Sequence, residues 1–411
     1  MKKFVISVAV FSFAWIFVSP ASSALPVVWE QRLDRPGWSF PSVQLTPNGS
    51  NLVVSQYSNA AFYGTQTYVQ ELAASSGSIA WTQTAALPGN ASTTTWVDNQ
   101  GNIYLMSDWG GHTIAKFGAN LAPIWSYSNG AASFEGVMNA ITDSSGNVYA
   151  QGYGPSGSGQ GTMLVKLNSS GSAVWTSTVQ HTSGKDDYST AMTMVSNGNI
   201  YTAGCDYGNG NSSQQGRILG HSAADGSVFL DMPVPQPDSI VFGLASDSQN
   251  NLYAAYAYNE FTSSGQRTGQ EQVVVDKLDQ QGNVIWQYPF NIPGMYAGYN
   301  TKNGLILAGA NEFYVDFNER ENGTEEPGIA AFDTSGDLLW MDTIDRPGWE
   351  VSGSLQVANG TIYMGLYNPN DYSQADVIAV TPAPEPSTLV LLSVGGISLA
   401  AYTWRRKRRA A

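Results

Sequence analysis

The sequence is poor in cysteine, histidine and charge. Its 411 residues include one cysteine, Cys205, so no internal disulfide can form and a paired-cysteine metal or redox site is excluded. The three histidines, His112, His181 and His221, lack the spacing of paired zinc ligands. Charged residues make up only 12% of the chain. A zinc site, a histidine base and a serine nucleophile that depends on such a base are therefore not expected.

Basic residues are especially scarce between the chain ends. Seven of the 18 lysines and arginines lie at the two ends, which leaves eleven bases against 32 acids, an excess of 21 negative charges. Such a body repels nucleic acid and anionic lipid, so no nucleic-acid partner is expected. Glycine (43 residues) and aromatic side chains (12%) are abundant instead. This composition is typical of short strands and tight turns, and predicts an all-β fold.

The N-terminus has the form of a secretory signal. Two lysines precede an almost wholly apolar run over residues 4–18, and small residues follow up to Ala24. This order predicts a signal peptide over residues 1–24, with cleavage between Ala24 and Leu25. An uncleaved membrane anchor is the alternative.

The C-terminus carries a second targeting pattern. A linker over residues 382–387 precedes an apolar segment over 388–404 and a basic tail over 405–411. Seventeen residues span about 25 Å as a helix, enough to cross a bilayer with little tilt. The bases predict a stop-transfer signal that stays in the cytoplasm. The linker contains Pro384, Glu385 and Pro386, and the tail bases are Arg405, Arg406, Lys407, Arg408 and Arg409.

This C-terminal pattern resembles the PEP-CTERM sorting signal of Gram-negative bacteria. The resemblance implies recognition by an exosortase-type membrane protease, removal of the tail, and release or transfer to the cell surface. Such proteins usually belong to bacteria that make extracellular polysaccharide. A permanent single-span anchor is the alternative, and both interpretations place residues 25–383 outside the inner membrane.

A degenerate repeat fills the region between the two ends. A typical unit begins with an Asp-x-x-Gly-Asn turn, continues through an apolar residue and a tyrosine, and closes on an apolar strand with tryptophan. A period near 50 residues with three or four short strands per unit predicts a β-propeller over residues 25–381. The closing aromatic residues lie 44 to 57 positions apart: Trp81, Trp125, Trp175, Phe229, Trp286 and Trp340.

The two ends of the repeat region indicate how the ring closes. Residues 28–38 nearly repeat residues 339–349, including the run Asp-Arg-Pro-Gly-Trp, and the last repeat lacks its tryptophan strand. We therefore expect residues 27–33 to supply the missing outer strand, with Trp29 completing seven units. Closure would pair a strand edge that otherwise invites aggregation. An array of two-sheet sandwiches is the alternative.

The repeat unit resembles the seven-bladed propeller repeats of the SBBP type, and its Gly-x-x-x-Trp ending is similar to that of quinoprotein propellers. A quinoprotein site needs a calcium-bound cofactor and a carboxylate base, and many members have adjacent cysteines, which this chain lacks. No cofactor is expected.

Two patterns bear on metal binding. Residues 316–326 superficially resemble a calcium loop, but Arg320 occupies a ligand position and no glutamate stands at the twelfth. We expect a solvated acidic loop there. The Asp-x-x-Gly-Asn turns are explained as Asx turns without a metal. We therefore predict that no metal binds and that the domain folds without one.

Two further patterns bear on polysaccharide. The pairs Asp186-Asp187 and Glu325-Glu326 are candidates for glycoside chemistry, although adjacent acids usually mark exposed loops. Aromatic residues expected in inter-strand loops can stack on sugar rings, the alternative being that they pack inside their own blades. These residues are Trp109, Tyr153, Tyr207, Phe313 and Tyr314.

The sequence thus predicts an exported, envelope- or surface-sorted seven-bladed propeller. The expected role is binding or structural, linked to extracellular polysaccharide, with no catalytic residue assigned. A secreted polysaccharide hydrolase or lyase on the same fold is the rival hypothesis, because propellers host binding and catalysis alike.

Overall fold

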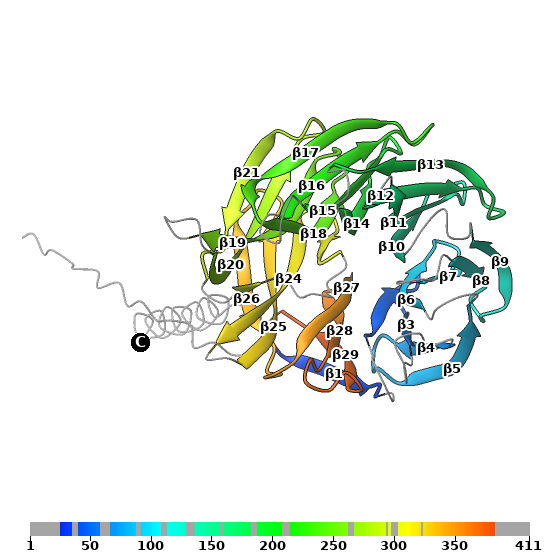
Figure 1. Ribbon diagram of the computed structural model, residues 1–411. Coiled ribbons are helices and arrows are strands. Elements are labelled where there is room, and N and C mark those ends of the chain that lie inside the picture. The colour runs from blue at the N-terminus through cyan, green and yellow to red at the C-terminus, as the bar shows by residue number, and fades with distance from the viewer. Residues whose placement is uncertain are drawn as a thin grey trace, which may run out of the picture. The chain divides into compact units, whose positions relative to one another are not determined.

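The strands form seven antiparallel sheets arranged as the blades of a ring (Figure 1). This confirms the all-β, seven-bladed propeller and excludes the array of sandwiches. The signal peptide, the linker beyond residue 382, the apolar segment and the basic tail lie outside the described residues. The computed structural model describes residues 25–34, 40–57, 66–87, 92–107, 113–128, 136–156, 159–181, 187–207, 214–261, 267–292, 295–296, 303–321 and 324–382.

Each blade is a meander of strands. Blades 1 to 3 contain β2 (Ser42–Leu45), β3 (Asn51–Tyr57), β4 (Gln66–Ala73) and β5 (Ile79–Ala86); β6 (Ser92–Val97), β7 (Ile103–Ser107), β8 (Thr113–Phe117) and β9 (Pro123–Ser128); β10 (Gly136–Thr142), β11 (Val148–Ser156), β12 (Gly159–Leu167) and β13 (Ala173–Val179). Blades 4 and 5 contain β14 (Asp187–Met194), β15 (Ile200–Tyr207), β16 (Gln214–His221) and β17 (Val228–Pro237); β18 (Ser239–Ser246), β19 (Leu252–Phe261), β20 (Arg267–Leu278) and β21 (Val284–Pro289). Blades 6 and 7 contain β22 (Met295–Tyr296), β23 (Leu305–Ala308), β24 (Glu312–Glu321), β25 (Thr324–Asp333) and β26 (Leu338–Thr343); β27 (Glu350–Ala358), β28 (Thr361–Tyr367), β29 (Ala375–Val380) and β1 (Val27–Arg32).

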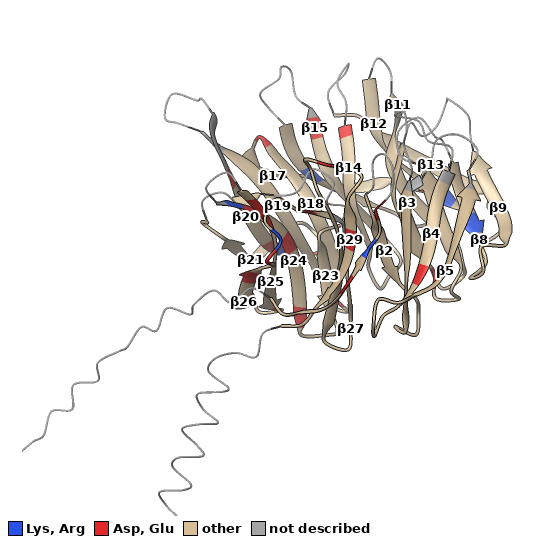
Figure 2. Cartoon of the chain, turned by 90° about the horizontal axis from the view of Figure 1, so that it is seen from below, with Lys and Arg blue, Asp and Glu red and all other residues tan. Residues whose placement is uncertain are grey.

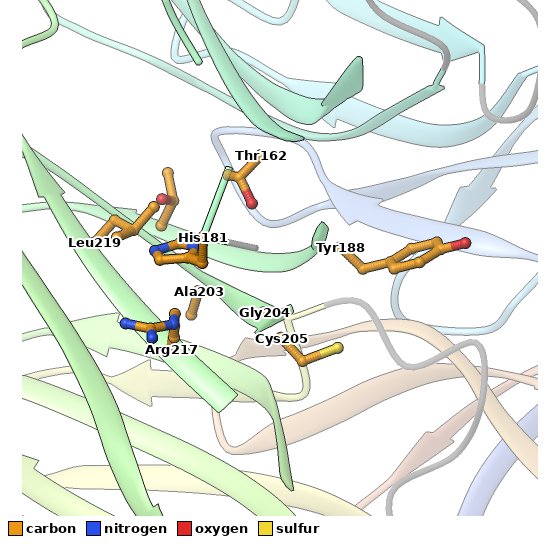
Figure 3. A pocket seen from close by; sticks show the side chains of 9 residues that line it. Thr162, His181, Tyr188, Ala203, Gly204, Cys205, Arg217 and Leu219 are labelled. Carbon is orange, nitrogen blue, oxygen red and sulfur yellow. The ribbon is translucent and has the colours of Figure 1, made fainter. Parts of the chain in front are cut away.

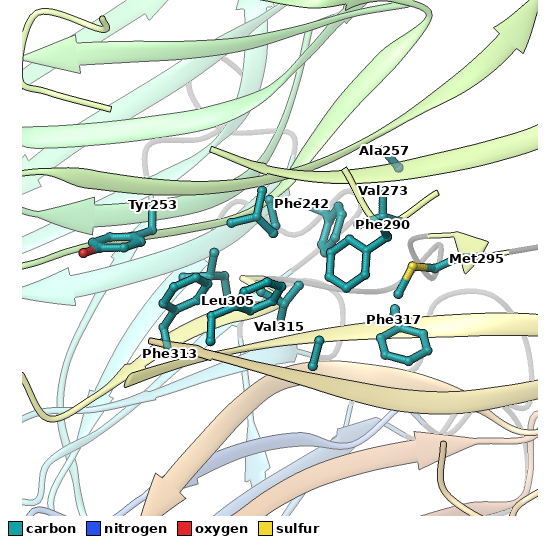
Figure 4. Packing of buried hydrophobic residues seen from close by; sticks show 14 of the residues in the cluster. Phe242, Tyr253, Ala257, Val273, Phe290, Met295, Leu305, Phe313, Val315 and Phe317 are labelled. Carbon is teal, nitrogen blue, oxygen red and sulfur yellow. The ribbon is translucent and has the colours of Figure 1, made fainter. Parts of the chain in front are cut away.

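Strand position within a blade follows the polarity pattern of the sequence. The middle strands β7 and β8 are buried at every residue, as expected for strands covered on both faces by neighbouring blades. The outer strand β9 begins with two exposed residues and then alternates, as expected for a strand with one wet face. Apolar side chains fill the spaces between blades; the largest such cluster joins blades 5 and 6 around Phe242, Phe290 and Phe313 (Figure 4).

The recurrent tryptophan joins neighbouring blades. The ring of Trp125 lies 5.9 Å from that of Tyr104 in its own blade, and its Nε1–H donates to the carbonyl of Ser169 in the next blade at 3.1 Å. Trp175 repeats this arrangement one blade further on, against Tyr149 and the carbonyl of Ala223. Such aromatic contacts bury a large apolar area at each seam. The repeat spacing of tryptophan is therefore a consequence of blade packing.

The Asp-x-x-Gly-Asn motif forms the turn between the first two strands of a blade. In blade 3, Asp143 Oδ1 accepts the backbone N–H groups of Ser145 and Asn147, both at 2.9 Å. Its Oδ2 accepts the Asn147 amide at 2.7 Å and the Tyr149 hydroxyl at 3.4 Å. Both carboxylate oxygens are thus used within the turn, as an Asx turn requires. We call the end of the ring that carries these tight turns the turn end, and the opposite end the loop end.

The N-terminal strand closes the ring. In Figure 1 the blue β1 lies beside the orange β29, with Trp29 opposite Ala379 and Arg32 opposite Asp376. Trp29 then joins blade 7 to blade 1 as the other tryptophans join their blades, by donating its Nε1–H to the carbonyl of Ala74 at 2.8 Å. The expected donation of residues 27–33 to the final blade is confirmed, with the strand ending at Arg32.

Candidate functional site

Charged side chains from five segments meet beside the start of blade 4. His181 follows β13, whereas Asp187, Asp206, Arg217 and Asp231 belong to the four strands of the blade. His181 Nδ1 lies 2.8 Å from Asp187 Oδ2, which also accepts the backbone N–H of His181 at 3.0 Å. His181 Nε2 lies 3.3 Å from Asp231 Oδ2. Arg217 links Asp231 and Asp206, at 2.8 Å and 2.6 Å.

Burial makes the histidine–aspartate contact specific. Asp187 is 1% exposed, and within the described residues its Oδ1 has no hydrogen-bond partner. A buried carboxylate bonded to one imidazole nitrogen fixes the orientation of the ring. The other nitrogen, Nε2, is also buried and lies beside Asp231. This pairing is not apparent in the sequence, which indicates Asp187 only as part of the Asp186-Asp187 pair and His181 only as a candidate metal ligand or lone base. The expectation of an exposed acidic loop is wrong for Asp187.

A small pocket lies beside His181 and Arg217, between blades 3 and 4 (Figure 3). Its volume of about 10 Å³ is enough for about one water molecule or hydroxyl group. Burial, and then nearby carboxylates, raise the pKa of Cys205 in its wall to about 12, so the thiol is not a nucleophile at neutral pH. Three hydroxyl-bearing residues also line the pocket: Thr162, Tyr188 and Thr202.

A second polar group lies at the loop end between blades 6 and 7. Glu350, the first residue of β27, accepts hydrogen bonds from the hydroxyls of Tyr367 and, at 3.4 Å, Tyr296. Burial, and then a hydrogen bond with Glu325, raise the pKa of Glu350 to about 7. Burial opposes ionisation of Glu325, but its bonds to Glu350 and Arg320 lower its pKa. Glu350 therefore keeps its proton to a higher pH than Glu325 does.

The closeness of Glu325 and Glu350 decides whether they can act as the acid and base of a glycoside hydrolase. Acid and base in glycoside hydrolases stand roughly 5 to 9.5 Å apart, to leave room for water or for the sugar carbon. Two carboxyl groups joined by a hydrogen bond are closer than that, so Glu325 and Glu350 as placed do not form such a pair. The structural partner of Glu325 is Glu350 rather than Glu326, and both residues of the predicted Glu325-Glu326 pair belong to strand β25 instead of a loop.

The expected acidic loop over residues 316–326 is wrong. Residues 312–321 form β24, in which Asp316 and Asn318 are 1% and 0% exposed, whereas Arg320 is exposed. Asn318 accepts the backbone N–H of Val351 through Oδ1 at 3.1 Å. Burial raises the pKa of Asp316 well above its ordinary range. In the described part of the chain, no three His, Cys, Asp or Glu residues are grouped as a metal site.

The aromatic residues expected in loops are also placed differently. Tyr153 lies in β11, and Phe313 and Tyr314 lie in β24; all three are at most 4% exposed and pack within the ring. The alternative, that these rings pack inside the blades, is therefore confirmed for them. Tyr207 ends β15 and Trp109 lies outside the described residues. Stacking of sugars on Tyr153, Phe313 or Tyr314 is excluded.

Comparison with known protein families finds a match at the C-terminus of the chain. Residues 382–409 match the family described as "PEP-CTERM protein-sorting motif". The chain ends in a PEP-CTERM sorting motif. This motif is a sorting signal recognised by an exosortase, a membrane protease, and it marks the chain for export and membrane-anchored sorting. The curated proteins contain no match to the chain. Within the described residues, no helix has the length and apolarity needed to cross a membrane.

Solved structures are similar to the chain in fold alone. A "Kuenenia stuttgartiensis Hydrazine Synthase" chain has a TM-score of 0.58 at 11% identity, covering 90% of this chain and 99% of that one. "Polysaccharide lyase Uly1" has 0.55 at 9%, covering 87% and 100%. A chain of a "Mitotic Checkpoint Complex" has 0.55 at 10%, covering 93% and 100%. Such different proteins share the propeller, so function has to be argued from the side chains.

Proposed function

We propose that the protein is exported and tethered before it reaches the surface. Cleavage between Ala24 and Leu25 removes the signal peptide, residues 388–404 hold the precursor in the inner membrane, and the basic tail stays in the cytoplasm. The exosortase then cuts at the linker that contains Glu385, and the propeller is released or transferred to the cell surface. The sorting-motif match over residues 382–409 is the observation that supports this route.

We test the route by protein chemistry on exported material. N-terminal sequencing should give Leu25 as the first residue, and intact mass should lack the basic tail when the sorting protease is present. Recovery of Met1 would reject the cleaved signal. Recovery of the tail residues in surface material would instead identify a permanent anchor.

The propeller in this scheme binds a neutral extracellular polysaccharide at the pocket between blades 3 and 4. The pocket carries this proposal because it is lined by hydroxyl, imidazole and guanidinium groups and admits about one hydroxyl. A sugar lying across the mouth can insert one hydroxyl there, with Tyr188 nearby. The acidic body disfavours a polyanionic chain.

The binding test compares the loop end with the turn end. Purified residues 25–382 should bind the neutral exopolysaccharide of the host, and Thr162→Val and Tyr188→Ala should each weaken binding about tenfold or more, because a hydroxyl partner or a ring contact is lost. Gln281→Ala, on an exposed turn of blade 5, is the matched control. Equal binding by all four proteins would reject the pocket as the site.

A second candidate is cleavage of polysaccharide, which the histidine–aspartate pair favours. In a β-elimination, His181 Nε2, once separated from Asp231, would take the proton next to a uronate carboxyl group. The electron pair of that C–H bond would form the carbon–carbon double bond, and the glycosidic oxygen would leave with a proton from water. The pairing of Arg217 with two aspartates and the negative body weigh against an acidic substrate. The His181→Asn variant should form no ultraviolet-absorbing unsaturated products but should still bind the polysaccharide. Intact polymer after prolonged incubation with wild type would reject cleavage.

A further inference from the structure

The described chain enters and leaves the ring at one point. Leu25 and Thr381 both lie at the turn end of blade 7, beside the turn that joins β27 to β28. The backbone N–H of Thr381 donates to the carbonyl of Pro26 at 3.2 Å, and Val27 pairs with Val380. Leu25 is buried, and its backbone N–H donates to the carbonyl of Thr343 at 3.0 Å. The turn end thus carries both exits.

The chain between the ring and the proposed anchor is short. The linker has six residues, 382–387, before the apolar segment that begins at Thr388. The seven Cα–Cα steps from Thr381 to Thr388 reach at most about 25 Å when fully extended. Strand β28 spans about 20 Å over its six steps from the turn end to the loop end, and residues 368–374 continue from its loop end. Only a linker fully extended along the outside of the blade would therefore bring the loop end to the same surface, whereas the turn end lies at the exit itself.

We propose that the turn end of the ring faces the membrane in the anchored precursor, so that the loop end and its pocket face away from the lipid. This inference rests on the anchoring part of the proposed function. A lipid surface is the partner, because the exits hold blade 7 within the reach of the linker. The orientation exposes the ligand site before the tail is removed.

The surface near the exits is compatible with a lipid interface. The outer strands of blades 6, 7 and 1 each carry an exposed apolar residue within their first two positions: Leu339 (36% exposed), Val28 (53%) and Ile79 (42%). The aspartates of the turns bond to groups of their own turns, as Asp333 does through Oδ1 with the N–H groups of Ser335 and Asp337. Figure 2 shows the ring from the side, with few charged residues on its strands.

Two single-cysteine labels test the orientation in the full-length precursor. Ser335→Cys lies on a turn of blade 6 and Asn370→Cys at the loop end of blade 7, and both positions are exposed. Cys205 is retained because it is buried with a raised pKa and should not react with maleimide in the folded protein. A donor dye is attached at either position, and zwitterionic phosphatidylcholine vesicles carry a headgroup acceptor.

Energy transfer to the lipid should be at least twofold more efficient from position 335 than from position 370. Equal transfer, which indicates a ring standing on its edge, or stronger transfer from position 370 would overturn the orientation while leaving the anchor in place. Flotation with the vesicles is measured in parallel. A precursor that does not float lacks the anchor, which overturns both this inference and the tethering step.

Discussion

At the scale of single residues, the closing blade has two carboxyl groups that hold protons near neutral pH. Glu350 bonds with Glu325 across the seam to blade 6, and Asp376 bonds with Glu30 of the donated strand. Burial, followed by these acid partners, raises the pKa of both groups to about 7, although Arg32 and Arg346 oppose the shift at Asp376. We therefore expect the pairing of β1 with β29, which joins the two ends of the described domain, to depend on pH through Asp376.

The sign of the expected pH effect follows from proton binding. The unfolded carboxyls titrate near their ordinary pKa of about 4, so between that value and about pH 7 the folded protein binds more protons. Its free energy of unfolding therefore falls as pH rises across this window and levels off above it. We expect Glu350→Gln to reduce the loss of unfolding free energy across this window by about 2 kcal/mol and to melt above wild type at pH 8, as scanning calorimetry would measure. Parallel curves for the variant and wild type would contradict the raised pKa of Glu350.

A second residue-scale prediction concerns the Asx turns. Asp143→Ala leaves two backbone N–H groups and the Asn147 amide without their acceptor. The variant should lose about 1 to 3 kcal/mol of stability, because partly buried donors are left unpaired.

Chelator should leave the melting temperature of the wild type within about 2 °C, whereas a metal present at 100 times its Kd would contribute about 2.7 kcal/mol to stability. A larger chelator effect would identify a structural metal.

At the scale of the element, most of the strands could be predicted from the sequence, because most blades repeat the same local motif of a tight turn, a strand with tyrosine and a strand with tryptophan. The failure at β24 is instructive. Phe313, Val315 and Phe317 occupy every second position, a period of two that indicates a strand, yet the acidic residues from Asp316 onward predicted a solvated loop. The polar pairs could not be predicted: Glu325 and Glu350 are far apart in the chain and meet only through the register of two blades.

Substitution of two glycines distinguishes the cost of backbone strain from the cost of disturbed packing at a blade seam. Gly171 (φ +84°) and Gly360 (φ +73°) both adopt the left-handed conformation, but an added Cβ at Gly171 would collide with the Trp125 ring, whereas none of the described atoms approaches one at Gly360. Gly360→Ala should cost about 1 kcal/mol through strain alone. Gly171→Ala should cost at least about 1 kcal/mol more, since Trp125 must move. Equal losses in urea unfolding would show that the tryptophan contact carries no energy.

At the scale of the whole molecule, ring closure determines cooperativity. Blade 7 is the blade whose strands come from both ends of the described domain, because β1 pairs with β29. Because β1 also bridges to blade 1 through Trp29, its loss would open one sheet edge and uncover part of the seam between blades 7 and 1. The near repeat of residues 28–38 and 339–349 predicted this arrangement, since the later copy occupies the equivalent position between blades 6 and 7.

Removal of residues 25–34 should therefore destabilise the whole ring and not blade 7 alone. The truncated domain should melt at least about 10 °C below residues 25–382 and aggregate, because β29 then presents an unpaired edge. A synthetic peptide of residues 25–34 should restore the melting temperature in a concentration-dependent way, since a strand that binds only the folded ring stabilises it by mass action. The same peptide with Trp29→Ala is the matched control and should rescue less. Truncated protein that melts like the intact domain, with or without peptide, would mean that the ring does not depend on this closure.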